Sequence, residues 1–515
     1  MNVEQNTYNP PITNTAQAEP GMGHTRIYPS MRVYQGMMRN TFPKWITQYG
    51  IVVYVMALVL VSAIYSSYSL PWYYVLSGVV AVFTFFVFSS TLVERTLVNK
   101  IRGDIRFERR LFLVAFIPRM IWMILAYAIF MQNYGDAFGF ENGDAVFYDD
   151  LGQSFSKAIQ SGTFKAEWEG NKNVIDISDM GYATYVGFIY TLTGNSIIAL
   201  RLLKCIWSSL TVILLYRLAK RNFGRETARY AAICCAMWPN FWYYCGTHLK
   251  EVEMVFLSVL FVEQAEQMLR SRRFTAWKLL PILLIVSAMF TIRSPLAIVA
   301  LLSLVFAVAI SFSKVVTWAK RIIVGVIAIL LIAFTMGNRI EEQSRKMIEA
   351  VQSGQQQANV EWRTRRAHGN AFAKYAGATV FAPMIFTLPF PTMVESFKGQ
   401  EVQQFLNGGN YVKNILSFFT ILALISLLIT GKWRDHLLPL SFMIGYLIVL
   451  TMSVFAQSER FHQPAMPFEL MFAAYGISVA LTKKKYKRWF GYWSIVMFIA
   501  AIAWNWFKLA GRGLV

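Results

Sequence analysis

Short stretches of the sequence carry ionisable residues that could move a proton or bind an anion. The first is ENGDAVFY, in which Asp144 is followed four residues later by Tyr148. In a helix this spacing places both side chains on one face. A carboxylate there could accept the proton of an incoming hydroxyl group. Asp is also among the best N-cap residues, worth about 1 kcal/mol in that role, so helix capping is an alternative for Asp144.

The second stretch, YYCGTHLKEVEMVFL, places Lys250 and Glu251 at the start of an otherwise apolar helix. Ionisable residues close to a bilayer are costly and tend to be functional. The alternative is structural, because acidic residues at a helix N-terminus contribute roughly 0.3 to 1 kcal/mol. A lysine in the same place can extend its ammonium group to the lipid headgroups.

The third stretch, SERFHQPAMPFELMFAAYG, presents Arg460 and His462 just before a helix. The guanidinium fork suits a phosphate, and each charge-assisted hydrogen bond contributes about 1.5 to 3 kcal/mol. A headgroup anchor is the simpler role. We expect Arg201 and Arg293 near the same face. Carboxylates and cations that converge there would suit a negatively charged lipid donor and a hydroxyl acceptor, and we predict no metal site.

The elements that must position these residues are helices that cross a membrane. Of the 515 residues 56% are hydrophobic and only 15% are charged. The apolar residues form blocks about 20 long, the length of a membrane span. This excludes a soluble enzyme and predicts an all-α polytopic membrane protein. About thirteen spans are expected, at 47–66, 71–92, 111–131, 196–217, 228–245, 249–268, 276–292, 294–312, 320–336, 414–430, 436–455, 464–481 and 489–507.

The basic residues predict the orientation of these spans. The chain has 49 Lys and Arg against 28 Asp and Glu, a formal charge of +21. If the spans alternate, the basic clusters all fall on one face, which the positive-inside rule assigns to the cytoplasm. Topology and contact with anionic lipid therefore explain the charge, and no nucleic-acid partner is needed. We expect the N-terminus in the cytoplasm and the C-terminus on the other side.

The predicted organisation has five parts. They are a disordered cytoplasmic tail (1–40), two extra N-terminal spans (41–110), a transmembrane core with a first outer loop at 132–184 (111–336), a large outer loop (337–413) and C-terminal spans (414–515). A short amphipathic helix is expected in the first loop, lying on the membrane. In the large loop, prolines interrupt residues 372–392, which we expect at the interface or re-entering it. The four cysteines lack metal-ligand spacing and are expected to pack.

These motifs together resemble the integral-membrane glycosyltransferases of the GT-C fold. The nearest branch includes the protein O-mannosyltransferases of glycosyltransferase family 39 and the aminoarabinose transferase of lipid A. The resemblance covers roughly residues 111 to 485. GDAVFY is similar to the first-loop signature that contains the catalytic Asp, and WPNFWYYCGTHLKE maps a later acidic position to Glu251. GYATYVGFIYTLTGNSIIALRLLK and RFHQPAMPFELMFAAYG are similar to two further motifs.

The resemblance implies a GT-C-like fold and transfer of a sugar from a polyprenyl-phosphate donor to an acceptor hydroxyl. Transfer would occur at the outer face by inverting single displacement, with Asp144 as the base. The implied site has Asp144 and Glu251 as catalytic residues, Lys250, Arg293, Arg460 and His462 on the donor phosphate, and Tyr148 and Arg201 on the substrate. No cofactor is expected. The implied partners are the donor, an acceptor that is a lipid, glycan or protein, and the lipid bilayer.

Two other functions fit the same features. A related ligase or polymerase would move a whole glycan from a polyprenyl diphosphate, with the loop at 337–413 as the acceptor platform. A transporter or flippase of lipid-linked sugars is the second alternative. The charges lie mainly at span ends instead of the midplane, which argues against transport. For the enzyme, the expected location is a bacterial inner membrane with the active site on the periplasmic face.

Overall fold

The computed structural model describes residues 44–89, 104–139, 142–172, 175–271, 276–310, 325–326, 384–396, 399–452, 458–510 and 512–515. These residues form helices and turns, and among them β pairing is limited to an isolated bridge between Ser69 and Val394. The all-helical fold class is therefore confirmed. The predicted tail 1–40, most of the predicted span at 320–336 and residues 337–383 of the large loop lie outside the described residues.

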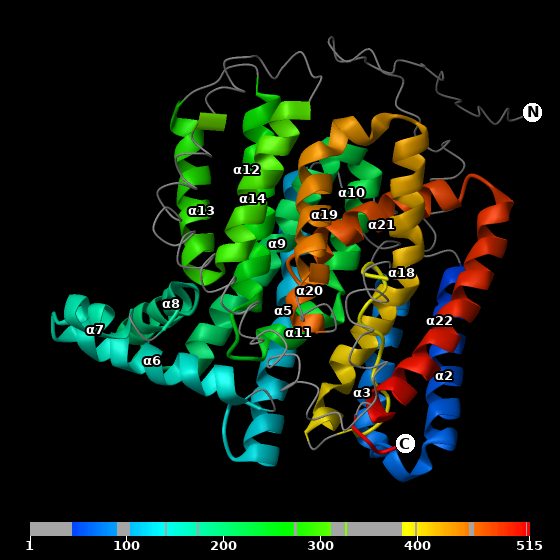
Figure 1. Cartoon of the computed structure of the whole chain (residues 1–515), viewed down its shortest axis with the longest axis horizontal. Helices are drawn as coiled ribbons and strands as arrows, with labels where there is room; N and C mark the ends of the chain where they lie inside the picture. Colours follow the sequence, from blue (N-terminus) through cyan, green and yellow to red (C-terminus); the bar gives the residue numbers. More distant parts are fainter. Residues whose placement is uncertain are drawn as a thin grey trace, which may run out of the picture.

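Within the described residues, five helices are long and apolar enough to cross a membrane. They are α2 (Lys44–Ile64), α5 (Asp104–Tyr134), α9 (Ile197–Phe223), α18 (Gln404–Ile429) and α22 (Lys484–Ala510). Further bundle helices are α3 (Trp72–Phe83), α10 (Arg225–Ala236), α12 (Glu251–Arg270), α13 (Leu279–Ile292), α14 (Ser294–Ile310), α19 (Leu437–Met452) and α21 (Met466–Ala480). Figure 1 shows most of them running roughly parallel, so the protein is a polytopic membrane protein.

One predicted span is broken in the structure. Residues 228–245 form parts of two helices, α10 and α11 (Pro239–Cys245). Pro239 has no amide hydrogen and cannot continue a helical hydrogen-bond ladder. The carbonyl groups at the end of α10 are bound by Arg119 of α5, whose guanidinium donates to Ala236 O at 2.9 Å and Cys235 O at 3.2 Å. A buried arginine thus satisfies backbone groups that the break exposes inside the bundle.

A group of three helices projects from the side of the bundle in Figure 1. These are α6 (Asn142–Gln160), α7 (Phe164–Asn171) and α8 (Ile177–Thr193). Helix α6 confirms the amphipathic helix predicted in the first outer loop. Helix α8 was not predicted, because that loop was expected to continue to residue 184. It begins after Asp176, whose side chain accepts a hydrogen bond from Ser178 N at 2.7 Å, an ordinary N-cap.

Glycines bring α8 close to its neighbours. A Cβ on Gly187 would overlap the Cβ of Phe155, so the glycine lets α6 and α8 pack side by side. A Cβ on Gly181 would overlap the backbone carbonyl of Thr291 in α13. Small residues permit this kind of close helix approach in membrane proteins. As a result, the first turn of α8 lies against the end of α13, two residues before Arg293.

The segment 384–396 is buried but not helical. Its backbone polar groups are bound by side chains of neighbouring helices. Asn414 of α18 donates to Thr387 O and to Pro389 O, the second at 3.1 Å, and Asn505 of α22 accepts from Met393 N at 2.6 Å. Irregular backbone is tolerated at membrane depth when the protein itself supplies the partners. Residues 384–392 agree with the prediction that 372–392 is not a clean span, and residues 372–383 lie outside the described residues. Helix α18 begins ten residues before the predicted 414.

Candidate active site

Arg460 connects two carboxylates that come from distant helices. Its Nη1 lies 2.6 Å from Oδ2 of Asp144, in the first turn of α6, and its Nε donates to Oε1 of Glu251, the first residue of α12. Arg460 lies in the single turn α20 (Glu459–His462). The side chain of Asp144 is 59% exposed, whereas that of Glu251 is only 1% exposed. The structure therefore brings both predicted acidic residues to the predicted arginine, with Asp144 on the accessible side.

The position of Asp144 within α6 bears on the capping alternative. It is the third residue of the helix and not the residue that precedes it. An acidic residue in the first turn still favours the helix electrostatically. Its Oδ2, however, is engaged by the Arg460 guanidinium. The carboxylate is thus part of a tertiary ion pair, which a cap of α6 alone would not require.

A second ionic cluster lies beside the first. Lys250, the residue before α12, places its Nζ 2.5 Å from Oδ1 of Asp179 and 2.9 Å from the carbonyl oxygen of Ser178, both in the first turn of α8. The hydroxyl of Tyr148 in α6 donates to the same Asp179 Oδ1 at 2.7 Å. The structure therefore joins the predicted Lys250 and Tyr148 through an aspartate that sequence reasoning had not selected.

The charges in this second cluster shape one another. Burial opposes ionisation of Asp179, but Lys250 and the two hydrogen bonds outweigh it and lower the pKa of the Asp179 carboxyl. Burial lowers the pKa of Lys250, and Asp179 acts against that shift. Burial, reinforced by Asp179, raises the pKa of Tyr148. Tyr148 therefore stays a neutral hydrogen-bond donor, while Asp179 favours the charged form of Lys250.

Arg293 and Arg460 share one aromatic ring. Arg293 is the C-cap residue of α13, and its Cζ lies 4.8 Å from the ring centroid of Phe461. The Cζ of Arg460 lies 5.8 Å from the same centroid. Cations at such distances are attracted to an aromatic face. Phe461 thus holds a second predicted phosphate ligand next to Arg460, a function that the RFHQP sequence alone did not reveal.

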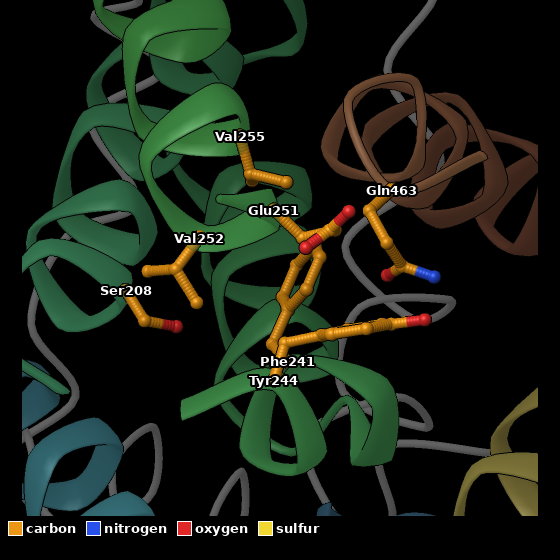
Figure 2. A pocket seen from close by; sticks show the side chains of 7 residues that line it. All are labelled: Ser208, Phe241, Tyr244, Glu251, Val252, Val255 and Gln463. Atoms are coloured by element: carbon orange, nitrogen blue, oxygen red, sulfur yellow. The ribbon is translucent and has the colours of Figure 1, made fainter. Parts of the chain in front are cut away.

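Glu251 also lines a small pocket, shown in Figure 2. Its walls are Ser208, Phe241, Tyr244, Val252, Val255 and Gln463. Within the part of the chain that the structure describes, Oε2 of Glu251 and Oε1 of Gln463 have no hydrogen-bond partner. Both atoms are acceptors, so the pocket is chemically suited to a small hydrogen-bond donor, such as a hydroxyl group or a water molecule.

The two remaining predicted site residues are buried. Nδ1 of His462, in α20, lies 2.8 Å from Nζ of Lys413, in α18, and both side chains are buried. Arg201 in α9 donates to the carbonyl oxygen of Ala137, and its Cζ lies 5.8 Å from the ring centroid of Tyr127. These contacts connect helices and loops around the site. The predicted contacts of His462 with the donor phosphate and of Arg201 with the substrate stay predictions.

Among the described residues, no group of three or more His, Cys, Asp or Glu side chains is arranged to hold a metal ion. The four cysteines are buried and free, as Cys205, Cys234, Cys235 and Cys245.

The protein is a bundle of apolar helices, and its carboxylates and cations gather where α6, α8, α12, α13 and α20 meet. This arrangement is suited to an integral-membrane enzyme that acts on a charged, lipid-linked substrate. Residues 181–336 match the model of the dolichyl-phosphate-mannose-protein mannosyltransferase family. The matched residues contain most of α8 and all of α9 to α14, with Lys250, Glu251 and Arg293. No curated protein matches the chain.

The family match confirms the resemblance inferred from the motifs. The chain is a membrane glycosyltransferase whose residues 181–336 are similar to the dolichyl-phosphate-mannose-protein mannosyltransferase family, which is GT-C-like. The match implies a dolichyl- or polyprenyl-phosphate sugar as the donor.

Proposed function

We propose that the protein transfers one sugar from a polyprenyl phosphate to an acceptor hydroxyl, with inversion at the anomeric carbon and with Asp144 as the base. The observation that carries this proposal is the pair of contacts made by Arg460, to Asp144 at 2.6 Å and to Glu251. These contacts put a solvent-accessible carboxylate next to a group that can bind a phosphate. A general base and a leaving-group ligand are then adjacent.

The proposed reaction is a single displacement. Asp144 accepts the proton of the acceptor hydroxyl as its oxygen forms a bond to the anomeric carbon. The bond between that carbon and the phosphate oxygen breaks, and its electron pair leaves with the polyprenyl phosphate. Arg460 divides its guanidinium between two carboxylates, so a donor phosphate that binds it competes with Asp144 for the same cation. Donor binding would thereby make the carboxylate of Asp144 more available to a hydroxyl.

The cations stabilise the leaving group. Charge develops on the phosphate in the transition state, and fixed cations at that point lower the barrier most effectively. Arg460 and Arg293 share the ring of Phe461, and Lys250 lies directly before Glu251 in the chain. We assign these three cations to the phosphate. Glu251 would hold Arg460 in place and offer its second oxygen to a hydroxyl of the substrate.

We infer the side of the membrane from the distribution of basic residues. The positive-inside rule, applied to alternating spans, places the N-terminus in the cytoplasm and the Asp144 loop on the opposite face. We propose a bacterial inner membrane with the reaction on the periplasmic side. The acceptor would be a lipid, a glycan or a protein that reaches this face.

A transfer assay with purified protein tests the proposal. The protein is reconstituted in liposomes with a radiolabelled polyprenyl-phosphate sugar and with lipid, glycan and peptide acceptors. We expect label on an acceptor and release of polyprenyl phosphate. Transfer that occurs only from a polyprenyl diphosphate carrying a whole glycan would replace the proposal with the ligase function. Movement of the lipid between leaflets without cleavage would replace it with transport.

A further inference from the structure

We infer that Asp179 is a positioning residue, which holds and orients the Lys250 ammonium toward the donor phosphate. The inference rests on the proposed function, since it assigns the origin of one cation of that site. Asp179 is separated from Lys250 by 71 residues, and its helix, α8, begins within the loop that was expected to continue to residue 184. The juxtaposition exists only in the folded protein.

The ammonium group is held by the first turn of α8. A lysine ammonium has three N–H donors. One donates to Asp179 Oδ1 at 2.5 Å and one to Ser178 O at 2.9 Å. Nζ also lies 5.5 Å from the ring centroid of Tyr148. Two acceptors on one turn and an aromatic ring fix the direction of the group, which leaves its third donor for an oxygen of the phosphate.

Asp179 is itself fixed by contacts beyond the lysine. Tyr148 OH donates to its Oδ1 at 2.7 Å. Asp176 caps the same turn, and Gly181 lets that turn lie against the end of α13. The carboxylate therefore cannot follow a mobile lysine. Asp179 therefore determines the position of the Lys250 ammonium, as a supporting residue orients a functional group through a hydrogen bond.

The charges that face Lys250 come from every element packed against it. Asp179 on α8 and Glu251 on α12 favour the ammonium, whereas Arg293 at the end of α13 disfavours it. Tyr148 on α6 contributes a neutral ring and hydroxyl. The side chain is also only 2% exposed, which disfavours the charge. Without Asp179, Glu251 alone would favour the charged form of Lys250, while burial and Arg293 would still disfavour it. The ammonium would then lose its proton at a lower pH.

A purely structural role would give a different result. If Asp179 only joined α6 to α8, its loss would lower the melting temperature without changing the pH at which activity declines. A positioning role instead predicts weaker donor binding and an altered basic limb of the pH profile. These two readouts separate the roles even if the variant is somewhat less stable.

The decisive comparison is Asp179→Asn against Asp176→Asn. Both substitutions remove one negative charge from the same turn, and Asn is an equally good N-cap, so Asp176→Asn leaves the helix start intact. Donor KM, kcat and the pH profile are measured in liposomes with the labelled polyprenyl-phosphate sugar. For Asp179→Asn we expect the donor KM to rise about ten- to hundredfold, because one hydrogen bond between charged groups is lost. We also expect the basic limb of the pH profile to move to lower pH. Asp176→Asn should match the wild type.

The inference is overturned if Asp179→Asn and Asp176→Asn share the wild-type donor KM and basic limb while the wild type transfers sugar. A wild type that transfers no sugar would instead overturn the proposed function, so the two failures are distinguishable.

If Asp179→Asn does not fold, the variant Tyr148→Phe tests the inference in its place. It removes one hydrogen bond to Asp179 but keeps the ring beside Lys250, and it should shift the basic limb in the same direction by a smaller amount; an unchanged limb would contradict the inference.

Discussion

Nη1 of Arg460 lies 2.6 Å from Oδ2 of Asp144, although 316 residues separate them in the chain. The same guanidinium binds Glu251, which is buried, while Asp144 is mostly exposed. Arg460 therefore stands between the interior of the helix bundle and the accessible side of the site. This arrangement puts a proton acceptor in direct hydrogen-bond contact with a group that can bind a phosphate.

Replacing the proposed base should abolish most of the activity. Asp144→Asn keeps the size of the side chain but removes its ability to accept a proton, and a general base contributes about 10²- to 10⁴-fold. We expect kcat to fall by that factor in the liposome assay. Asp150→Asn on the same helix is the matched control, since Asp150 is exposed. Transfer at the wild-type rate by Asp144→Asn would remove Asp144 from the role of base.

The geometry of Arg460 should matter as well as its charge. Arg460→Lys keeps the positive charge but cannot reach Asp144 and Glu251 with two nitrogens of one planar group. Each lost charge-assisted bond weakens binding by about 1.5 to 3 kcal/mol, so we expect kcat/KM to fall roughly ten- to hundredfold. Arg217→Lys, at the exposed pair with Glu108, should have no such effect. Equal rates for the two variants would show that only the charge of Arg460 is used.

The wild-type enzyme should lose activity at high pH. Phosphate binding by Lys250 requires its proton, and burial lowers the pKa of this lysine from its ordinary value of 10.5. Activity should therefore fall as the pH rises through that lowered pKa. Asp179, with a pKa below its ordinary 3.8, stays ionised throughout this range. The measurement is kcat/KM from about pH 6 to about pH 10.5. Lys250→Arg, whose charge does not titrate there, should lack the decline.

The close approach of α8 and α13 should not tolerate a side chain at Gly181. A Cβ there would overlap the carbonyl of Thr291, and overpacking of this kind costs about 1 to 3 kcal/mol. We expect Gly181→Ala to lower the melting temperature and to raise the donor KM, because Asp179 and Arg293 flank the contact. Gly170→Ala in α7, where a Cβ would meet nothing within 4 Å, serves as the control. A variant as stable and active as this control would contradict the packing argument.

The buried lysine of α18 should be needed for stability. Nζ of Lys413 lies 2.8 Å from His462, 3.6 Å from Oε1 of Glu469 and 2.7 Å from the carbonyl of Leu388. Lys413→Met leaves Glu469 buried without its cation, which costs about 3 to 5 kcal/mol. The melting temperature in detergent should fall markedly. The double variant Lys413→Met with Glu469→Gln should recover much of the loss, and no recovery would show that the ion pair is not the cause.

Most of the helices could be predicted from the sequence. Apolar blocks about 20 residues long predicted α2, α5 and α9 to within several residues, because the bilayer demands that length whatever the neighbours are. The break between α10 and α11 was missed. There the apolar run continues across Pro239, and only the Arg119 side chain from α5 makes the interruption acceptable. Helix α8 was missed because its polar first turn resembles a loop.

The candidate site was only partly predictable. Asp144, Glu251 and Arg460 were selected because ionisable side chains are rare and costly in so apolar a chain, and the motifs around them resemble those of a known family. Asp179 was one acid among several in an acidic loop. Nothing in its neighbourhood along the chain indicates Lys250 as its partner. The signal that could have found it is its place two residues before GYATY, the start of a motif similar to that of the known family.

The amino-acid sequence by itself determined that this protein spans a membrane many times and which of its residues are chemically unusual there. Both properties depend on composition and local spacing, which are written directly in the chain. Only the tertiary structure decided that Arg460 joins Asp144 to Glu251 and that Asp179 holds Lys250. Contacts between side chains of separate helices depend on helix rotation and close approach. These are set by packing at residues such as Gly181, which lets α8 lie against the end of α13.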